Sequence, residues 1–341
     1  MSSPSVVIVS PSLAVANNGN WQTARRWQAL LRASHRVRIT QAWPDAMAQG
    51  DDVMLALHAR RSADSVQAWS AQRGSAGLAV VLTGTDLYRD IAVDASARLS
   101  LELAAAIVLL QDLAPSALPP ETRARSRVIY QSTTPRRPLA KGSRTLRVVM
   151  VGHLRQVKEP QTLFEAARML PPDAGIRIRH IGEAGEPELG AIARLTARDC
   201  PHYEWMGALP HNQARREIQR AHVLVHTSAM EGGAHVIMEA VCSATPVLAS
   251  RVDGNVGMLG DGYQGYFPFR DAGRLATLLM QCRDEQQRLL GAPAEHSVET
   301  LLETLRRQCA ARAPLFSPDS ERAALLALVS DLAAGPKNQT T

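Results

Sequence analysis

Short apolar runs alternate with amphipathic stretches along the chain. The first run, Ser5–Ser10, is rich in β-branched residues and leads through a turn-rich loop into a helical period over Trp21–Leu31. Further strands in the first half are predicted to begin at Val37, Val53, Leu78, Ile107 and Arg127, and helices to cover residues 63–72 and to start at Ala95. Apolar strands between helices are typical of a parallel sheet that is covered on both faces.

The alternation is interrupted and then restarts. Residues 131–144 contain two prolines, three arginines and no apolar period, so we interpret them as a linker between domains. After the linker, strands are predicted to begin at Leu146, Ile176, Tyr203, His222, Pro246 and Gly265, and helices to cover residues 212–220 and to start near His235. A last helix is predicted over Pro318–Ala334, with Asp319 or Ser320 as its N-cap.

Two successive arrays of this kind predict an α/β protein with two Rossmann-like domains. We expect an N-terminal domain at residues 1–140 and a C-terminal domain at residues 145–316. The last helix and tail, residues 317–341, are expected to pack back on the N-terminal domain.

The composition narrows the class of protein. The 341 residues carry 38 Lys and Arg against 32 Asp and Glu, a net charge of +6, and 45% of them are hydrophobic. The basic excess suits anionic small molecules, and no Lys/Arg run is long enough to indicate a nucleic-acid partner. The four cysteines form no CxxC pair, which favours reduced thiols. No leader begins the chain and charged residues interrupt its most apolar stretch, so we expect a cytoplasmic protein without membrane insertion.

Candidate chemistry is densest between Val223 and Gly254. Glu231 and Glu239 lie eight residues apart, and a glycine pair follows the first of them just before the predicted helix. Glycines let a backbone approach a ligand closely, and free amides at a helix start favour an anion such as diphosphate. Glu239 would accept hydrogen bonds from ribose hydroxyls and Glu231 from a second polyol, which fits a nucleotide sugar. The donor-binding residues expected here are Gly232, Gly233, Ala234, His235 and Glu239.

This segment resembles the Glu-x7-Glu element of the retaining glycosyltransferases of the GT-B fold, family 4 type. Residues 148–170 are similar to that family's GRLxxxKG segment, residues 177–185 to its next strand and glycine turn, and residues 203–228 to its GxxxxxELxxxYxxAdvfvxPS segment. The resemblance covers most of Arg147–Ala276. It implies a GT-B architecture, in which two Rossmann-like domains have parallel sheets that face each other across a cleft, with the C-terminal domain binding a nucleotide sugar.

In this family, the Arg and Lys of GRLxxxKG neutralise the donor diphosphate. Lys158 matches the lysine, whereas His153, after Gly152, stands at the arginine position, and Arg155 would supply the missing cation. The resemblance thus implies Lys158, Arg155 and Glu231 as catalytic residues and adds Gly152 and His153 to the donor site. Ser243–Ala244 and the segment from Asp253 depart from the family pattern. No metal is expected, because the chain has no Asp-x-Asp pair.

Three loops of the first half follow predicted strands, at the edge where α/β proteins bind ligands. The glycine-containing loop at residues 17–20 corresponds in position to one that faces the donor in such enzymes, so Gly19 is assigned to donor binding. Two guanidiniums and an imidazole close together suit a small dianion. The acceptor-binding residues expected from these loops are Asn20, Arg26, His58, Arg60, Arg61, Thr83 and Asp86. A plain connecting loop, solvated surface charges and a helix cap are the structural alternatives.

Together, the three loops resemble the selenosugar synthases, the glycosyltransferases associated with selenoneine biosynthesis. The resemblance implies transfer of a sugar from UDP-GlcNAc or UDP-glucose to selenophosphate, with formation of a carbon–selenium bond and without a cofactor. Selenophosphate is already ionised at neutral pH, so it needs cations to hold it rather than a general base. Two other functions remain open: an ordinary family 4 transferase with a hydroxyl acceptor, and a nucleotide-sugar-binding protein without catalysis.

Overall fold

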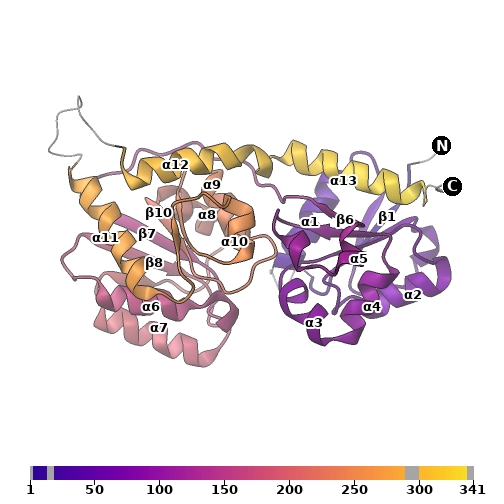
Figure 1. Ribbon diagram of the computed structural model, residues 1–341, viewed down its shortest axis with the longest axis horizontal. Helices are drawn as coiled ribbons and strands as arrows, with labels where there is room; N and C mark the ends of the chain where they lie inside the picture. The colour runs from indigo at the N-terminus through magenta and orange to yellow at the C-terminus, as the bar shows by residue number, and fades with distance from the viewer. Residues whose placement is uncertain (1–2, 14–18, 289–298, 336–341) are drawn as a thin grey trace. The chain divides into compact units, whose positions relative to one another are not determined.

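The computed structural model describes residues 3–13, 19–288 and 299–335 (Figure 1). Its contacts divide the chain into two units. The first comprises Met1–Ser132, Glu231–Gly233 and Leu315–Thr341, and the second comprises Thr133–Met230 and Ala234–Pro314. The division falls inside the predicted linker, whose residues 131–144 form no helix or strand. The domain bounds 1–140, 145–316 and 317–341 stay a prediction.

The first unit is built on a parallel six-stranded sheet with the order β2-β1-β3-β4-β5-β6. Its strands are β1 (Val6–Val9), β2 (Val37–Thr40), β3 (Val53–Leu57), β4 (Leu78–Val81), β5 (Ala106–Leu109) and β6 (Ser126–Val128). Its helices are α1 (Gly19–Leu31), α2 (Ala63–Arg73), α3 (Ile91–Val93), α4 (Ala95–Leu103), α5 (Pro120–Arg123) and α13 (Pro318–Ala333). Every strand and long helix predicted for this half is present, with ends that differ by a few residues.

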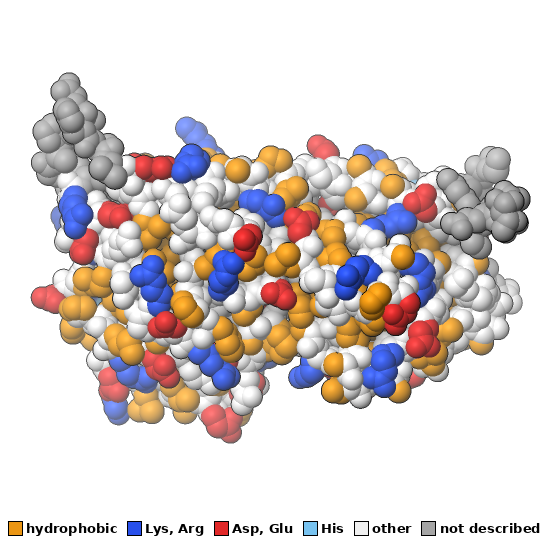
Figure 2. All heavy atoms as spheres, viewed as in Figure 1, with side chains coloured by type: hydrophobic (Ala, Val, Ile, Leu, Met, Phe, Trp, Pro, Cys, Tyr) orange, Lys and Arg blue, Asp and Glu red, His pale blue; other side chains and the backbone are white. Residues whose placement is uncertain are grey.

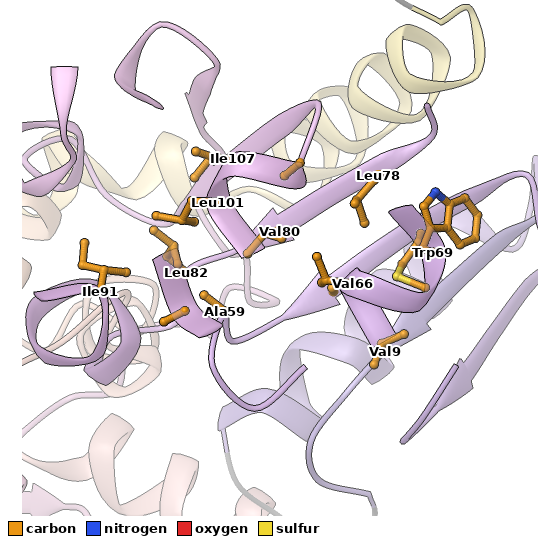
Figure 3. Packing of buried hydrophobic residues seen from close by; sticks show 14 of the residues in the cluster. Val9, Ala59, Val66, Trp69, Leu78, Val80, Leu82, Ile91, Leu101 and Ile107 are labelled. Carbon is orange, nitrogen blue, oxygen red and sulfur yellow. The ribbon is translucent and has the colours of Figure 1, made fainter. Parts of the chain in front are cut away.

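The core explains why these strands are apolar throughout. On one face of the sheet, Val9 and Val80 pack with Val66 and Trp69 of α2 and with Leu101 of α4 (Figure 3). On the other face, strand residues pack with Trp27 of α1 and with side chains of α13. Because both faces are covered, the central strands β1, β3, β4 and β5 are buried at every position.

Helix α13 returns to the first unit and packs on α1. Glu321 on α13 is completely buried and accepts hydrogen bonds from Arg26 and Trp27 of α1 and from the backbone and hydroxyl of Ser132. The predicted N-cap was wrong: Ser317 caps the helix, because Pro318 occupies the first helical position.

The second unit contains another parallel six-stranded sheet, in the order β12-β11-β10-β7-β8-β9. Its strands are β7 (Leu146–Val151), β8 (Ile176–Ile181), β9 (Tyr203–Trp205), β10 (Val223–His226), β11 (Val247–Ser250) and β12 (Tyr266–Phe267). Its helices are α6 (Pro160–Met169), α7 (Pro187–Asp199), α8 (His211–Arg220), α9 (His235–Val241), α10 (Asp253–Leu259), α11 (Ala272–Arg288) and α12 (Leu301–Arg312). Two parallel sheets with intervening helices confirm the predicted α/β class.

Several helices of this unit were not predicted, among them α7, α10, α11 and α12. The clearest case is α10, whose sequence is DGNVGML. Its two glycines have low helix propensity, but six of its seven residues are buried. Tertiary packing therefore stabilises a helix that the local sequence disfavours.

The surface carries charges of both signs. Figure 2 shows Lys and Arg side chains interspersed with Asp and Glu on the visible face. The four cysteines are free and buried. None of the described helices is long and apolar enough to cross a membrane.

Candidate active site

The turn between β7 and α6 carries the predicted cations. After β7, the chain passes Gly152 and forms a short 3-10 helix, Gln156–Lys158, and Glu159 then adopts a left-handed conformation with φ 46°. GRLxxxKG has glycine at the Glu159 position, and a side chain in that conformation costs about 1–2 kcal/mol. Glu159 forms a bidentate ion pair with Arg270, with nitrogen–oxygen distances of 2.9 and 3.1 Å. This pair holds a turn that glycine would otherwise form without strain.

Lys158 is held between the ends of two neighbouring strands. Its carbonyl oxygen accepts a hydrogen bond from the Thr227 hydroxyl at 2.7 Å, and the Val157 carbonyl accepts one from the Ala229 amide at 2.9 Å. A Cβ atom added to Gly152 would lie 3.9 Å from Cγ of Lys158, so the lysine side chain runs past that glycine. The structure thus joins the Lys158 turn to the loop that follows β10, at the carboxyl edge of the sheet.

His153 does not replace the family arginine as a cation. The His153 side chain is half-buried, and its Nδ1 accepts a hydrogen bond from the Glu183 amide at 3.2 Å. Burial, together with the nearby positive charge of Arg155, lowers the pKa of His153 below its ordinary value. Arg155 is exposed and lies over Gly185, where an added Cβ would meet its Cγ at 2.8 Å. The positive charge of this turn therefore comes from Arg155 and Lys158.

Glu239 lies on α9 and is oriented by two basic side chains of α8. The Nε2 atom of His211 is 2.6 Å from Oε1 of the buried Glu239, and Nε of Arg215 is 3.9 Å from the same oxygen. Arg215 is itself anchored by its hydrogen bond to the Thr134 carbonyl at 2.8 Å. His211 and Arg215 were not predicted as site residues. Their i,i+4 spacing at the start of the helix predicted over residues 212–220, which would put both on one face, was the available signal.

The predicted donor residues in and after the loop before α9 are divided between the two units. Glu231 is buried, but Glu231–Gly233 clusters with the first unit, whereas Ala234, His235 and Glu239 belong to the second. A shared role for Glu231 and Glu239 stays a prediction. Helix α9 has seven residues, about two turns, and Ala234 at its N-cap offers no side-chain hydrogen bond. We therefore do not assign the diphosphate to the amides of this helix.

In the first unit, Asp86 ties together the ends of β3 and β4. The completely buried carboxylate accepts hydrogen bonds from the backbone amides of Ala59 at 3.0 Å, Thr83 at 2.9 Å and Gly84 at 2.8 Å. His58, with φ 72°, is buried beside it and contacts the Thr85 hydroxyl at 3.2 Å. Burial lowers the pKa of His58, although Asp86 opposes this shift. Asp86 therefore positions the strand-end loops, and its contact with an acceptor stays a prediction.

Arg60 and Arg61, two of the predicted acceptor arginines, differ in ion pairing and exposure. Arg60 donates from Nε to Asp90 at 2.8 Å, so a carboxylate balances its charge, whereas Arg61 is exposed. Arg26 forms an ion pair with buried Glu321, which favours a structural role, and acceptor binding by Arg26 stays a prediction.

The remaining acceptor and loop residues are less constrained. Gly19 and Asn20 form the start of α1. Thr83 is half-buried, and its backbone amide donates a hydrogen bond to Asp86. Asn17 and Asn18 lie outside the described residues. Across the described residues, no group of three or more His, Cys, Asp or Glu is placed to hold a metal ion.

Comparison with known proteins finds one family model that is similar to part of the chain. Residues 131–288 match the model of the glycosyl transferases group 1. The matched residues include the Lys158 turn and Glu239. No curated protein matches the chain in sequence.

Solved structures that resemble the chain have the GT-B fold. Sucrose-phosphate synthase from Thermosynechococcus elongatus is 17% identical with a TM-score of 0.73, over 97% of this chain and 99% of that one. Anabaena HepE in complex with UDP and glucose is 15% identical with a TM-score of 0.69, over 96% and 99%. S. aureus TarM is 13% identical with a TM-score of 0.62, and 82% of this chain matches only 55% of TarM. The two parallel sheets of this chain therefore have the arrangement of the GT-B fold.

Proposed function

We propose that this protein is a glycosyltransferase that uses a UDP-sugar. The carrying observation is the Lys158 turn at the carboxyl edge of the second sheet, within the residues that match the group 1 model, clamped by Thr227, Ala229 and the Glu159–Arg270 ion pair. A rigid cation at this edge suits the diphosphate of a nucleotide sugar. HepE, whose structure contains UDP and glucose, supports UDP as the nucleotide.

The donor would be held through its diphosphate and through its ribose. Lys158 and Arg155 bind the phosphate oxygens, and Glu239 accepts hydrogen bonds from the ribose hydroxyls. His211 and Arg215 keep the Glu239 carboxylate oriented for this role. As the bond between the anomeric carbon and UDP breaks, negative charge grows on the diphosphate, and the two cations stabilise it more strongly than in the ground state.

For the acceptor we propose selenophosphate, on the resemblance of the first-half loops to selenosugar synthases. Selenium uses an electron pair to form the bond to the anomeric carbon, and the carbon–oxygen bond to UDP breaks with its electrons leaving on UDP. No proton transfer from the acceptor is needed, because selenophosphate is already an anion. Arg61, the exposed arginine of the β3 loop, is then the principal acceptor cation, since Arg60 is balanced by Asp90.

The Arg60–Asp90 ion pair also favours a second candidate, a hydroxyl acceptor. Hydrogen bonds from Arg60 and Arg89 lower the pKa of Asp90, although burial opposes the shift. The Asp90 carboxylate offsets the positive charge of Arg60, which a dianion would need for binding. A neutral alcohol does not need this charge and suits the site better. In this case the donor site and the departure of UDP are unchanged.

One assay separates these functions. UDP release from UDP-GlcNAc and UDP-glucose is measured with selenophosphate, with inorganic phosphate as the matched control, and with neither anion. We expect release that depends on selenophosphate and that Arg61→Ala reduces by raising the Michaelis constant for selenophosphate. Equal release with both anions or with neither would contradict the selenophosphate proposal. Absence of UDP binding would contradict the glycosyltransferase proposal itself.

A further inference from the structure

One face of the second sheet is uncovered near its edge strand β9. The strand register puts Arg147 of β7, Arg177 and Arg179 of β8, and Glu204 of β9 on this face. All four residues are exposed, whereas Phe164 of α6 packs on the opposite face against buried aromatic residues of β8 and β9. Doubly wound sheets normally bury both faces of their strands under helices. The outward arginines mark a part of the sheet that meets solvent or a ligand.

A cavity of about 980 Å³ lies along this face, entirely within the second unit. The three strands contribute to its lining together with the segment Gly142–Thr145 and the end of α8. Its volume falls in the range of small-molecule sites. The charged residues that line it are Arg144, Arg147, Arg177, Arg179, Arg220, Glu204 and Glu217.

The positive charges in this cavity are not all balanced. Glu204 and Glu217 pair with Arg179, at 3.2 and 2.7 Å, and Glu217 is 3.4 Å from Arg220. Across the parts of the chain that the structure describes, no carboxylate pairs with Arg144, Arg147 or Arg177. Moreover, Arg147 and Arg177 are direct partners in the β7–β8 ladder, where like charges repel. A bound anion would remove this repulsion.

The chain segment that precedes Arg147 is held in place and contains a further lysine. Burial and the charges of Arg306 and Arg147 lower the pKa of Lys141 to about 7. The neighbouring segment is fixed by Arg283, which donates to the carbonyl oxygens of Ser143 at 2.8 Å and Arg144 at 2.9 Å. The positive potential of this region is thus held in a preformed geometry.

We propose that this cavity binds a small phosphate-bearing anion through Arg144, Arg147 and Arg177. Guanidinium groups bind phosphate oxygens in bidentate fashion, and three unbalanced arginines match a ligand with two or more negative charges. The site is distinct from the donor site. Arg147 lies at the amino end of β7 and the Lys158 turn follows its carboxyl end, about 16 Å along the strand. The proposal is independent of the proposed function.

The test is calorimetric titration with inorganic pyrophosphate. Every protein carries Lys158→Ala, which suppresses binding of pyrophosphate to the proposed donor site. We expect binding to this background, and we expect Arg147→Gln or Arg177→Gln to raise the dissociation constant about tenfold or more. The matched control is Arg307→Gln, which removes an exposed arginine paired with Glu299 outside the cavity and should leave the constant unchanged.

Either of two calorimetric results would overturn the proposal: no binding of pyrophosphate to the Lys158→Ala background, or binding that Arg147→Gln and Arg177→Gln leave unchanged. Folding is checked by the melting temperature, which Arg177→Gln should leave unchanged or raise because it removes a like-charge contact. Hydrogen exchange gives a second readout, with protection by pyrophosphate expected in β8 and β9. Protection confined to the β7–α6 turn would place the anion in the donor site and overturn the proposal. The UDP-release assay tests the proposed function separately.

Discussion

The Glu321→Ala substitution tests whether Arg26 has a structural role or binds the acceptor. Glu321 is completely buried on α13 and accepts hydrogen bonds from Arg26 at 3.0 and 3.1 Å, from Trp27 at 2.7 Å, and from the Ser132 amide and hydroxyl at 2.8 and 2.6 Å. Alanine would leave a guanidinium, an indole N–H and a backbone amide without their acceptor. The contact between α13 and α1 would lose its central interaction.

The expected cost follows from burial. Removing one partner of a buried ion pair costs about 3–5 kcal/mol, because the other charge stays buried without compensation. For a unit of this size, the melting temperature should fall by about 6–20 °C. The matched control on the same helix is Asp331→Ala, which removes an exposed pair with Arg127 at 3.0 Å and should cost about 1 kcal/mol or less.

Tryptophan fluorescence during urea unfolding measures this loss, because Trp21, Trp27, Trp43 and Trp69 lie in the first unit and only Trp205 lies in the second. Arg26→Ala should destabilise the protein similarly, and the two substitutions together should cost clearly less than their sum. If Arg26→Ala leaves stability intact and raises the Michaelis constant for the acceptor, then Arg26 binds substrate and has no structural role.

Three further predictions concern the second unit. Lys158→Ala should lower turnover more than donor affinity, because its attraction grows with charge on the departing diphosphate; steady-state kinetics in which only the donor Michaelis constant changes would contradict this. Glu239→Ala should weaken UDP binding by about 1–3 kcal/mol in calorimetry, and unchanged affinity would exclude the ribose contact. Burial and the charges of Arg306 and Arg147 lower the pKa of Lys141 to about 7, well below the pKa of a lysine in the unfolded chain. As the pH rises, Lys141 therefore loses its proton at a lower pH in the folded protein than in the unfolded protein. Stability should therefore rise with pH above about 7, and Lys141→Met should flatten the rise in urea titrations from pH 6 to 9; an unchanged slope would show that Lys141 is not responsible.

Two features of the candidate site could not be predicted from neighbouring residues, because they depend on contacts with distant parts of the chain. The KEP sequence at Lys158 predicted a cation in a turn but not the left-handed conformation of Glu159, which depends on Arg270, 111 residues later in the chain. Similarly, Arg60 and Arg61 look equivalent in sequence. The pairing of β3 with β4 brings Asp90 close to Arg60, and the two form an ion pair, whereas Arg61 is exposed.

The α/β class, the two arrays of strands and the positions of the strand-end loops could be predicted from the sequence. These features depend on hydrophobic periodicity and on turn residues, which act over a few neighbouring positions. The folded structure was needed to show that Arg26 pairs with Glu321, that DGNVGML forms a helix, and that Arg147 lies beside Arg177. Burial, ion pairing and strand register join residues far apart in the chain, and local patterns carry no information about which distant partner is met.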